Sequence, residues 1–385
     1  MTIANPGLEG VVVADTAISD VDGERGHLVI AGADVEELAR TASFEEATAR
    51  VLAAGAAGAA GAAGAAPAAV AERLAAARAE AWELLPRLGD ALEHEDGMDA
   101  LRTALAHLRA AGGTSAGGAA SAASAADADM SAALRAIGAG PVFVAAWSRR
   151  RAGQAPVAPD PSLGQAADYL RMTLGRPADA AAVAAMNAYL VTVIDHAMSA
   201  STFTARVIAS TGSDLLSALV GAIGALKGPL HGGAPGPVLD MLDAIGRPEH
   251  AERWLLDELA AGRRIMGMGH RVYRVRDPRA AVLEAAARPL SSARLELARA
   301  VEAAASKILR ERKPDRPLAA NVEFATAVLL DAVGLPREQF SATFAISRLA
   351  GWSAHVMEQR RTGRLIRPAS VYIGPRPAQG GGAAA

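Results

Sequence analysis

The stretch SDLLSALVGAIGALKGPLHGGAPGPVLDMLDAI, residues 213–245, contains two apolar runs at helical spacing on either side of the string GPLHGG, residues 228–233. It predicts two helices joined by a glycine-rich loop. A second string, GMGHRVYRVRDPR at residues 267–279, again places a histidine next to glycine. Because glycine lets the backbone approach a ligand closely, the two loops that carry His231 and His270 indicate a functional site.

The break between the two predicted helices suits a bound oxygen atom. His231 lies where one helix ends and the next begins, and amides at helix ends lack partners within the helix. An oxyanion or a carbonyl oxygen is therefore a suitable ligand beside this histidine. The alternative for a lone histidine is a core or surface position without such a role.

Helical periodicity continues through nearly the whole chain, and strands are predicted only near its start. Two short β-branched runs at residues 10–18 and 27–30, separated by the turn-rich residues 20–26, predict a small hairpin. The fold class is therefore mainly α. Helices are predicted at residues 35–40 after an Asp34 cap, 44–52 after a Ser43 cap, from Pro67 to a stop at Pro86, and at 98–111, 133–151, 162–174, 178–196, 213–227, 235–245, 250–261, 279–287, 295–311, 322–333 and 336–361.

Composition indicates a globular protein with a large core, split over two lobes. The chain has 385 residues, of which 51% are hydrophobic and 21% are charged. A net charge of -2 gives no overall field that favours nucleic acid or an anionic membrane. The absence of cysteine excludes disulfides and thiolate chemistry and fits a reducing cytosol. The start of the chain lacks a signal-peptide pattern, and the apolar run at residues 215–226 is shorter than the ~20 residues that span a bilayer. We therefore expect a soluble, cytoplasmic protein.

Three segments are expected to carry no chemistry. The string AAGAAGAAGAAGAAP, residues 53–67, is interpreted as a loop or a frayed helix end. Residues 111–129 are rich in Gly, Ser and Ala and predict a surface linker. Residues 376–385 predict a disordered tail.

Arginines gather around the second glycine loop. His270 is followed by Arg271, Arg274, Arg276 and Arg279. Guanidinium groups suit carboxylates and phosphates because they donate two parallel, charge-assisted hydrogen bonds. The alternative is a solvated, basic start of a helix.

Two further patterns place charged side chains among apolar ones. Glu323 lies in the string NVEFATA at the start of a predicted helix, where burial would raise its pKa toward the range of a general base. The alternative is a carboxylate favoured by the helix dipole. In the run AISRLAGWSAHVMEQRRTGRLIRP, residues 345–368, Arg348 lies inside a helix and Arg367 beyond it. A buried helix arginine normally needs an anionic partner.

These motifs, taken in order, resemble the citrate synthase family. The matching strings are GPLHGG, GxGHRVY followed by DPR, NVxF, and SRxxGWxAH followed by RLIRP. Upstream, IDHAMSASTFTARVIAST at residues 194–211 and GLEGVVVADTAISDVDGERG at residues 7–26 are also similar to family segments. The resemblance covers most of the chain and is weakest at residues 53–128.

The resemblance implies a role for each matching residue. His231 would hydrogen-bond the thioester carbonyl of acetyl-CoA while Glu323 removes a methyl proton, and His270 would polarise the ketone of oxaloacetate. Donors preorganised at both oxygens would lower the barrier. His196, Arg279 and Arg348 would hold the oxaloacetate carboxylates, Arg367 would reach the site of a second subunit, and Arg274 and Arg271 would face the CoA phosphates near main-chain contacts from Met266, Gly267, Met268 and Gly269.

The family's architecture is likewise implied. It is an almost all-α homodimer with a large domain at residues 1–227 and 334–375 and a small domain at residues 228–333. Closure of the cleft between them would exclude water. No metal or other cofactor is implied, because acetyl-CoA is a co-substrate. Water would then hydrolyse citryl-CoA to citrate and CoA.

Three positions depart from the family pattern. Glu323 replaces the aspartate of most members, residues 30–32 lack the arginine of a YRG-like string, and Ser199 replaces an asparagine. Two alternatives to a citrate synthase follow. A 2-methylcitrate synthase would use propionyl-CoA, because one methylene is worth only ~1–3 kcal/mol in a pocket. A weakly active paralogue would serve as a ligand-binding or regulatory dimer. The charge balance argues against a nucleic-acid binder.

Overall fold

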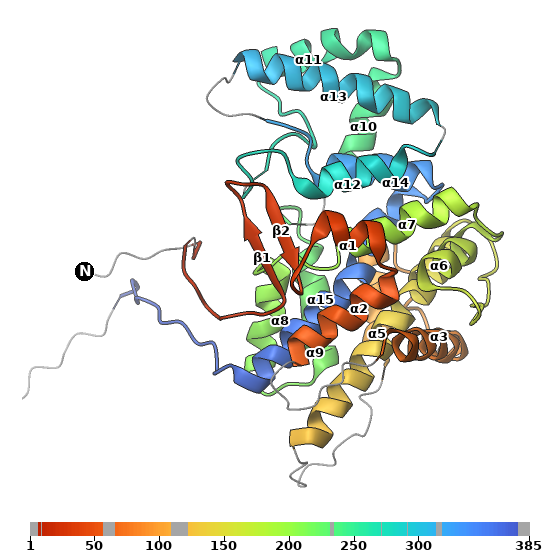
Figure 1. Cartoon of the computed structure of the whole chain (residues 1–385), viewed down its shortest axis with the longest axis vertical. Coiled ribbons are helices and arrows are strands. Elements are labelled where there is room, and N and C mark those ends of the chain that lie inside the picture. Colours follow the sequence, from red (N-terminus) through yellow and green to blue (C-terminus); the bar gives the residue numbers. More distant parts are fainter. Residues whose placement is uncertain are drawn as a thin grey trace, which may run out of the picture.

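A computed structural model describes residues 7–8, 10–56, 66–108, 122–231, 235–270, 272–290, 292–312 and 318–375. Within these residues the regular structure is mainly helical, as the periodicity predicts (Figure 1). The helices are α1 Val35–Thr41, α2 Phe44–Ala56, α3 Pro67–Leu84, α4 Gly97–Ala106, α5 Ala122–Arg151, α6 Gln165–Leu174, α7 Ala180–Thr192, α8 Ala200–Ser210, α9 Leu215–Leu226, α10 Pro235–Ile245, α11 Ala251–Ala260, α12 Pro278–Ala287, α13 Ala293–Arg312, α14 Val322–Ala332 and α15 Phe340–Thr362, with short 3-10 turns η1 Leu85–Arg87, η2 Pro248–His250 and η3 Arg337–Gln339.

The small sheet confirms one predicted strand and corrects the other. Strands β1 Ser19–Asp22, β2 His27–Ile30 and β3 Ala33–Asp34 pair antiparallel in the order β1-β2-β3. The second predicted strand is β2. The prediction of a strand at residues 10–18 is wrong, because the strand lies at Ser19–Asp22, partly inside the expected turn. A strand needs a partner for its backbone groups, and in the described residues β2 pairs only from Ser19 onward.

Helix boundaries follow the predicted caps. The Asp34 side chain accepts from the Glu36 amide at 2.8 Å. The Ser43 hydroxyl accepts from the Glu46 amide at 3.2 Å, while the Glu46 carboxylate accepts from the Ser43 amide at 2.7 Å, which is a capping box.

Two helical regions were not predicted. Helix α8 occupies Ala200–Ser210, a stretch whose Ser and Thr content hides its helical period. Helix α5 begins at Ala122, so the linker predicted at residues 111–129 is wrong from there on. Five of the eight residues from 122 to 129 are alanine, the strongest helix former, so local propensity favours the helix here. Residues 57–65, 109–121 and 376–385, where other low-complexity predictions fall, lie outside the described residues.

Helices α5 and α15 form the centre of the larger part of the molecule. Helix α15 packs against α2, α5, α8 and α9, and nearly every residue from Phe340 to Gln359 is buried. The segment Ala125–Arg151 of α5 is long and apolar enough to cross a membrane, contrary to the expectation from residues 215–226. However, 83% of its apolar window is buried inside the fold, which is typical of a core helix.

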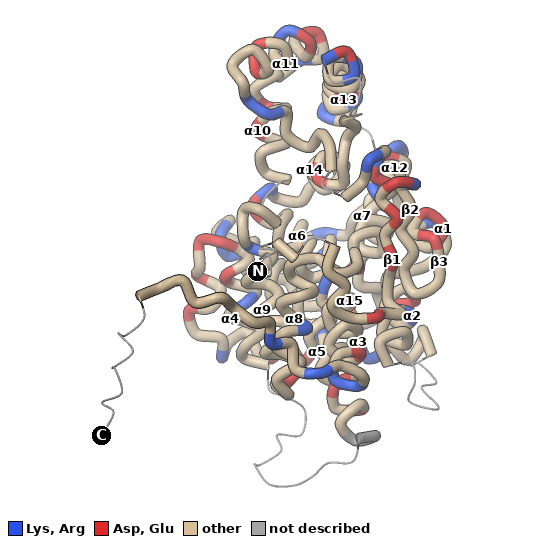
Figure 2. Tube along the Cα trace, turned by 90° about the vertical axis from the view of Figure 1, so that its left-hand side faces the viewer, with Lys and Arg blue, Asp and Glu red and all other residues tan. Residues whose placement is uncertain are grey.

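The other end of the molecule is formed by helices that follow the first glycine loop. Figure 1 shows α10, α11 and α13 at one end, with α12 and α14 between them and the large helical body. Figure 2 shows from the side that α11 and α13 stand apart from that body. Helix α12 contacts α14 as well as α1 and α7 of the body. The division into domains at residues 228 and 333 stays a prediction.

Candidate active site

One cavity brings together the side chains that sequence reasoning placed in five separate motifs. Its volume is about 710 Å³, and it lies where α8, α14 and α15 meet the two glycine loops. The motifs are far apart along the chain, so only the fold could juxtapose them. The predicted site residues that line it are His196, His231, Gly269, His270, Arg279, Glu323 and Arg348.

The loop that carries His270 is joined to the segment before α14 by backbone pairing. Met268 and Ala320 form an antiparallel bridge, and the Gly269 amide donates to the Ala319 carbonyl at 2.8 Å. The Asn321 side-chain amide donates to the Gly269 carbonyl at 2.8 Å. The two segments therefore behave as one unit.

Asn321 also begins helix α14. Its side-chain oxygen accepts from the amides of Glu323 at 3.0 Å and Phe324 at 3.2 Å, which is an N-cap. A side chain at Gly267, where φ is +73°, would place its Cβ 2.7 Å from the Phe324 Cβ. The glycine is therefore required for close packing, and the cap sets Glu323 in the first turn of the helix.

Glu323 has the electrostatic setting of a general base. Burial raises the pKa of its carboxyl group, and the charge of Arg279 opposes that rise. A raised pKa makes the carboxylate a stronger base toward a carbon acid. The sequence-based hypothesis for Glu323 therefore agrees with its surroundings.

Asp277 is a site residue that sequence reasoning missed. It accepts two hydrogen bonds from the Arg279 guanidinium, at 3.0 and 2.8 Å, and a third from the Val322 amide at 3.2 Å. Burial raises its pKa, but the charge and hydrogen bonds of Arg279 outweigh burial and lower it below the usual value. The signal was an aspartate directly before Pro278, the usual pattern of a helix N-cap.

The proton on His270 is placed by its neighbours. Nδ1 accepts from the amides of Val272 at 3.0 Å and Tyr273 at 3.1 Å, so the neutral ring carries its proton on Nε2. The Arg279 guanidinium nitrogen Nη2 lies 3.2 Å from that Nε2. Both groups are donors, and an acceptor oxygen from a ligand would satisfy both. Burial, with the charge of Arg279, lowers the pKa of His270 to about 4.

His231 is oriented by a hydroxyl that the sequence did not single out. The Ser201 amide donates to His231 Nε2 at 3.2 Å, and the Ser201 hydroxyl lies 2.8 Å from the same atom. The Trp352 indole, which can only donate, hydrogen-bonds the Ser201 oxygen at 3.2 Å. The serine proton therefore points to Nε2, and the imidazole proton lies on Nδ1. Burial, with the charge of Arg348, lowers the pKa of His231 to about 4.

Arg348 presents a buried donor without a partner. Its Nε donates to the Val193 carbonyl at 2.5 Å and its guanidinium stacks on Phe344 at 4.7 Å, yet Nη1 has no hydrogen-bond partner among the described residues. Burial lowers the pKa of Arg348 to about 10. A buried cation with a free donor favours an anionic ligand in the cavity.

His196 lies beside the second glycine loop. Its Nε2 is 3.1 Å from the Tyr273 hydroxyl, and its ring meets the His270 ring edge-on at 6.0 Å between centroids. Burial, with the charges of Arg279 and Arg348, lowers the pKa of His196 well below its usual value. The ring is therefore neutral near neutral pH.

Several predicted residues lie outside this cavity. Arg367 lines a separate groove of about 920 Å³ between the N-terminal and C-terminal segments. Arg274 is exposed, and its amide donates to the Gly23 carbonyl at 2.9 Å. Arg271 lies outside the described residues. Of the predicted CoA contacts, Met266, Gly267 and Met268 do not line the cavity, although Gly269 does.

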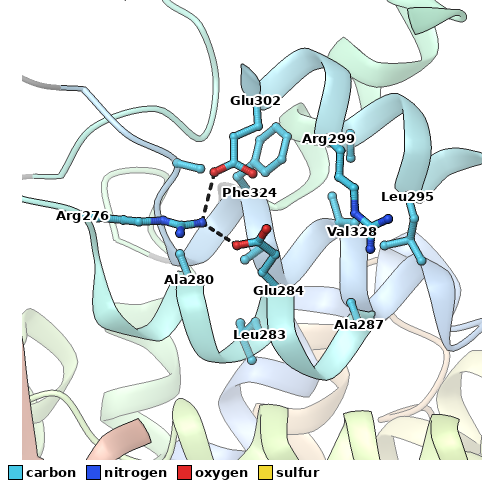
Figure 3. A pocket seen from close by; sticks show the side chains of 13 residues that line it. Arg276, Ala280, Leu283, Glu284, Ala287, Leu295, Arg299, Glu302, Phe324 and Val328 are labelled. Carbon is cyan, nitrogen blue, oxygen red and sulfur yellow. Dashed lines mark hydrogen bonds and ion pairs between the residues drawn. The ribbon is translucent and has the colours of Figure 1, made fainter. Parts of the chain in front are cut away.

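Arg276 of the basic cluster is already occupied by carboxylates. It pairs with Glu284 at 2.6 Å and with Glu302 at 3.2 Å beside a small cavity between α12, α13 and α14 (Figure 3). The cluster is therefore not a uniform basic surface, because Arg279 and Arg276 each face acidic partners on the protein.

The lowered histidine pKa values predict a loss of stability in acid. His231 and His270 should titrate near pH 4 when folded, whereas the usual value is 6.5. Their contribution to stability is complete above the unfolded value and is lost as the pH falls from there through 4. Urea unfolding at pH about 7 and about 5 measures this loss. In a His231→Gln, His270→Gln double variant the loss should be smaller, and an equal loss would contradict the assignment.

Comparisons with known proteins give a consistent result. The family model for the citrate synthase C-terminal domain matches residues 7–369. A citrate synthase of Haloferax volcanii is 37% identical over 96% of this chain and 96% of its own length, and a 2-methylcitrate synthase of Mycobacterium tuberculosis is 36% identical over 96% and 90%. A putative citrate synthase 2 of Mycobacterium tuberculosis is 52% identical, but the match spans 55% of this chain and only 56% of that relative's length.

Solved structures give the same likeness. The citrate synthase of Pyrobaculum aerophilum has a TM-score of 0.83 at 31% identity and covers 98% of this chain and 95% of its own. The citrate synthase of Thermoplasma acidophilum, in a ternary complex with carboxymethyl coenzyme A and oxaloacetate, has a TM-score of 0.81 at 27% identity over 98% of both chains.

Proposed function

This chain belongs to the citrate synthase family, and we propose that it condenses acetyl-CoA with oxaloacetate and hydrolyses citryl-CoA to citrate and CoA. The observation that carries the proposal is the single cavity in which two neutral imidazoles and a carboxylate of raised pKa meet. Family membership alone supports the reaction class, and this geometry supports the assignment of roles.

The proposed chemistry uses the proton positions at the site. Glu323 removes a proton from the acetyl methyl group. His231 donates a hydrogen bond from its Nδ1–H group to the thioester oxygen, where negative charge develops. His270 donates a hydrogen bond from its Nε2–H group to the ketone oxygen of oxaloacetate. Neutral imidazoles with low pKa values act as fixed donors, so both oxygens are stabilised in the transition state without a rearrangement of the site. The proposal requires no metal.

Three cationic or polar side chains would bind the oxaloacetate carboxylates. Arg348 offers the buried donor Nη1, Arg279 converges with His270 on one point, and His196 lines the same wall. Arginine forks fit carboxylates through paired hydrogen bonds. Oxaloacetate, a dicarboxylate with an adjacent ketone, matches this set of donors.

Replacement of Arg279 tests this assignment. We expect Arg279→Leu to raise the KM for oxaloacetate about tenfold or more, because a charge-assisted donor is lost at a buried site. The KM for acetyl-CoA should change less. Arg276→Leu is the matched control, since Arg276 is in the same segment but does not line the cavity. Steady-state kinetics of both variants decide the point, and an unchanged oxaloacetate KM in Arg279→Leu would contradict the role.

The acyl-CoA preference separates the proposal from its nearest alternative. A 2-methylcitrate synthase would turn over propionyl-CoA faster than acetyl-CoA, and relatives of both kinds are about equally similar to this chain. We expect kcat/KM to be higher with acetyl-CoA in a thiol-release assay with oxaloacetate present. A higher value with propionyl-CoA would favour the alternative. If CoA is released from neither acetyl-CoA nor propionyl-CoA, the result would favour a weakly active paralogue with a ligand-binding or regulatory role.

A homodimer is part of the proposal. The C-terminal segment leaves the body of the chain (Figure 1) and exposes Leu365, Val371, Tyr372 and Ile373, the last of them 94% exposed. Apolar side chains on an extended segment favour burial against another chain. We propose that this segment of each subunit docks on its partner, so that Arg367 reaches the partner's site. Analytical ultracentrifugation of the full chain measures the stoichiometry.

The remaining assignments concern CoA and the compartment. Arg274, exposed near the mouth of the His270 loop, and Arg271 would face the CoA phosphates, with main-chain contacts from residues 266–269. We propose a cytoplasmic enzyme, consistent with a chain that lacks cysteine. Weaker CoA binding in Arg274→Ala would support the first assignment.

A further inference from the structure

The segment between α7 and α8 turns around a buried carboxylate. Asp195 directly precedes His196 and has no exposed surface. Its Oδ2 accepts a hydrogen bond from the Ala197 amide at 3.1 Å and another from the Ser19 hydroxyl. The same Ser19 oxygen accepts from the Ala197 amide at 2.8 Å. Asp195 and Ser19 together therefore close the turn that contains His196.

The turn needs this support because of its backbone conformation. Ala197 has a φ of 49°, in the left-handed region that residues with a side chain rarely adopt. Such a conformation persists where the surroundings hold it, and here the Ala197 amide is held by Asp195 and Ser19. Helix α15 approaches closely from the other side: a Cβ on Gly351 would lie 2.5 Å from Asp195 Oδ1.

A chain of buried donors fixes the charge on Asp195. Arg206 donates to His355 Nδ1 from Nε at 3.0 Å and from Nη2 at 2.7 Å, so His355 carries a proton on Nε2. That Nε2 lies 3.2 Å from Asp195 Oδ1 and 3.3 Å from Oδ2. Glu358 forms an ion pair with Arg206 behind the histidine.

The balance of these contacts keeps the carboxyl group ionised. Burial raises its pKa, but the hydrogen bond of His355, the charge of Arg348 and the hydrogen bond of Ser19 lower the pKa of Asp195 below its usual value. A buried carboxylate is therefore stable here because it has several partners.

The same segment carries two parts of the candidate oxaloacetate site. The Val193 carbonyl accepts from Arg348 Nε at 2.5 Å, and His196 lines the cavity three residues later. A shift of the turn would therefore move the His196 ring and the anchor of Arg348 together. Asp195 itself does not line the cavity.

We propose that Asp195 is a positioning residue for the oxaloacetate site, acting through the Ala197 turn on His196 and through segment 193–197 on Arg348, with His355 as the donor that holds it. The identity of the ligand rests on the proposed function. The hydrogen-bond geometry does not depend on that function, so the role of Asp195 and the proposed function can fail separately.

The test compares two buried carboxylates. Asp195→Asn replaces an acceptor that faces donors from Ser19, Ala197 and His355, and we expect the dissociation constant for oxaloacetate, measured by calorimetry, to rise about tenfold or more. Asp168→Asn is the matched control. Asp168 is equally buried and pairs with Arg78 at 2.8 Å, but its partners Arg78 and Arg171 do not belong to the segments that line the cavity. We expect that control to lower the unfolding temperature and to keep the dissociation constant within about twofold.

A pair of changes at His355 provides a rescue. His355→Gln keeps an acceptor for Arg206 and a donor for Asp195, so oxaloacetate affinity should stay within about threefold of the wild type. His355→Leu removes both and should weaken binding about as much as Asp195→Asn. A purely structural role predicts instead that affinity does not distinguish the Gln and Leu variants once both are folded.

Each outcome decides the proposal. An unchanged dissociation constant in folded Asp195→Asn, or an equal loss in Asp168→Asn, would overturn it. If Asp195→Asn does not fold, Ser19→Ala removes one donor from the turn and should weaken binding about threefold; no change would overturn the proposal.

A ligand-independent measurement separates the proposal from the proposed function. If the wild type binds oxaloacetate but forms no citrate, the function fails and the affinities still test Asp195. If the wild type does not bind oxaloacetate, the nitrogen NMR signals of the His196 ring are compared. They should move in Asp195→Asn and stay unchanged in Asp168→Asn, and the absence of a shift in the first variant would overturn the proposal.

Discussion

Replacement of Glu323 with glutamine is expected to lower kcat by about 10²–10⁴-fold, the usual contribution of a positioned general base. Glutamine keeps the shape of the side chain but cannot accept a proton at neutral pH. Because Glu323 faces the acyl donor in the proposed mechanism, the dissociation constant for oxaloacetate should stay nearly unchanged. Steady-state turnover and oxaloacetate calorimetry on the same variant measure both quantities.

Two further measurements sharpen this prediction. Glu323→Asp keeps a carboxylate but withdraws it by about a bond length from a backbone that fits glutamate, so a partial loss of kcat is expected. The wild-type rate should also fall in acid, because burial raises the pKa of Glu323 and the base works only when ionised. Near-normal turnover in Glu323→Gln would remove this residue from the mechanism.

Replacement of His231 with alanine is expected to lower kcat by about 10²–10³-fold, as the loss of one donor to a developing oxyanion does in other enzymes. The imidazole is neutral at working pH, because burial lowers its pKa to about 4, so the loss is that of a fixed hydrogen-bond donor. Oxaloacetate affinity should change little. A single-turnover measurement of free-thiol formation separates this effect on the chemical step from the later dissociation of products.

A control and a supporting variant belong to the same experiment. His107 is exposed on the last turn of α4, and His107→Ala should leave kcat unchanged. Ser201→Ala removes the hydroxyl that orients the His231 ring and should lower kcat less than His231→Ala does. A full rate in His231→Ala, or an equal loss in His107→Ala, would exclude the role assigned to His231.

The site residues were predictable from local sequence for a physical reason. His231 and His270 lie next to glycines, which allow tight turns and close approach, and the Arg348 pattern places a cation in an apolar helix. Asp195 and Ser201 were not predicted, because partners that decide their importance lie far away along the chain. The Ser201 hydroxyl, for instance, gains its role from Trp352 and His231. Asp277 was missed although its cap position and its partner Arg279 are local.

The ends of strands and helices show the same difference between features set by local sequence and features set by distant contacts. The caps at Asp34 and Ser43 were predictable because a cap is a contact within a few residues. The strand predicted at residues 10–18 was wrong because pairing with β2, and not β-branched composition, decides which residues form a strand. The early start of α5 was missed because the prediction joined residues 122–129, which are mostly alanine and favour a helix, to the Gly- and Ser-rich run before them.

The sequence by itself determined the helical class, most helix positions, the two glycine loops and the chemical types at the site, because periodicity, caps and glycine requirements act over short distances. The tertiary structure alone decided which side chains share a cavity, where each imidazole carries its proton, and how far burial moves each pKa. Most of those properties depend on neighbours that lie far apart in the chain, although the proton of His270 is placed by the nearby amides of Val272 and Tyr273. His231 and His270 therefore could be recognised as a pair from the sequence, but their distinct donor atoms follow only from the contacts of Ser201 and Val272.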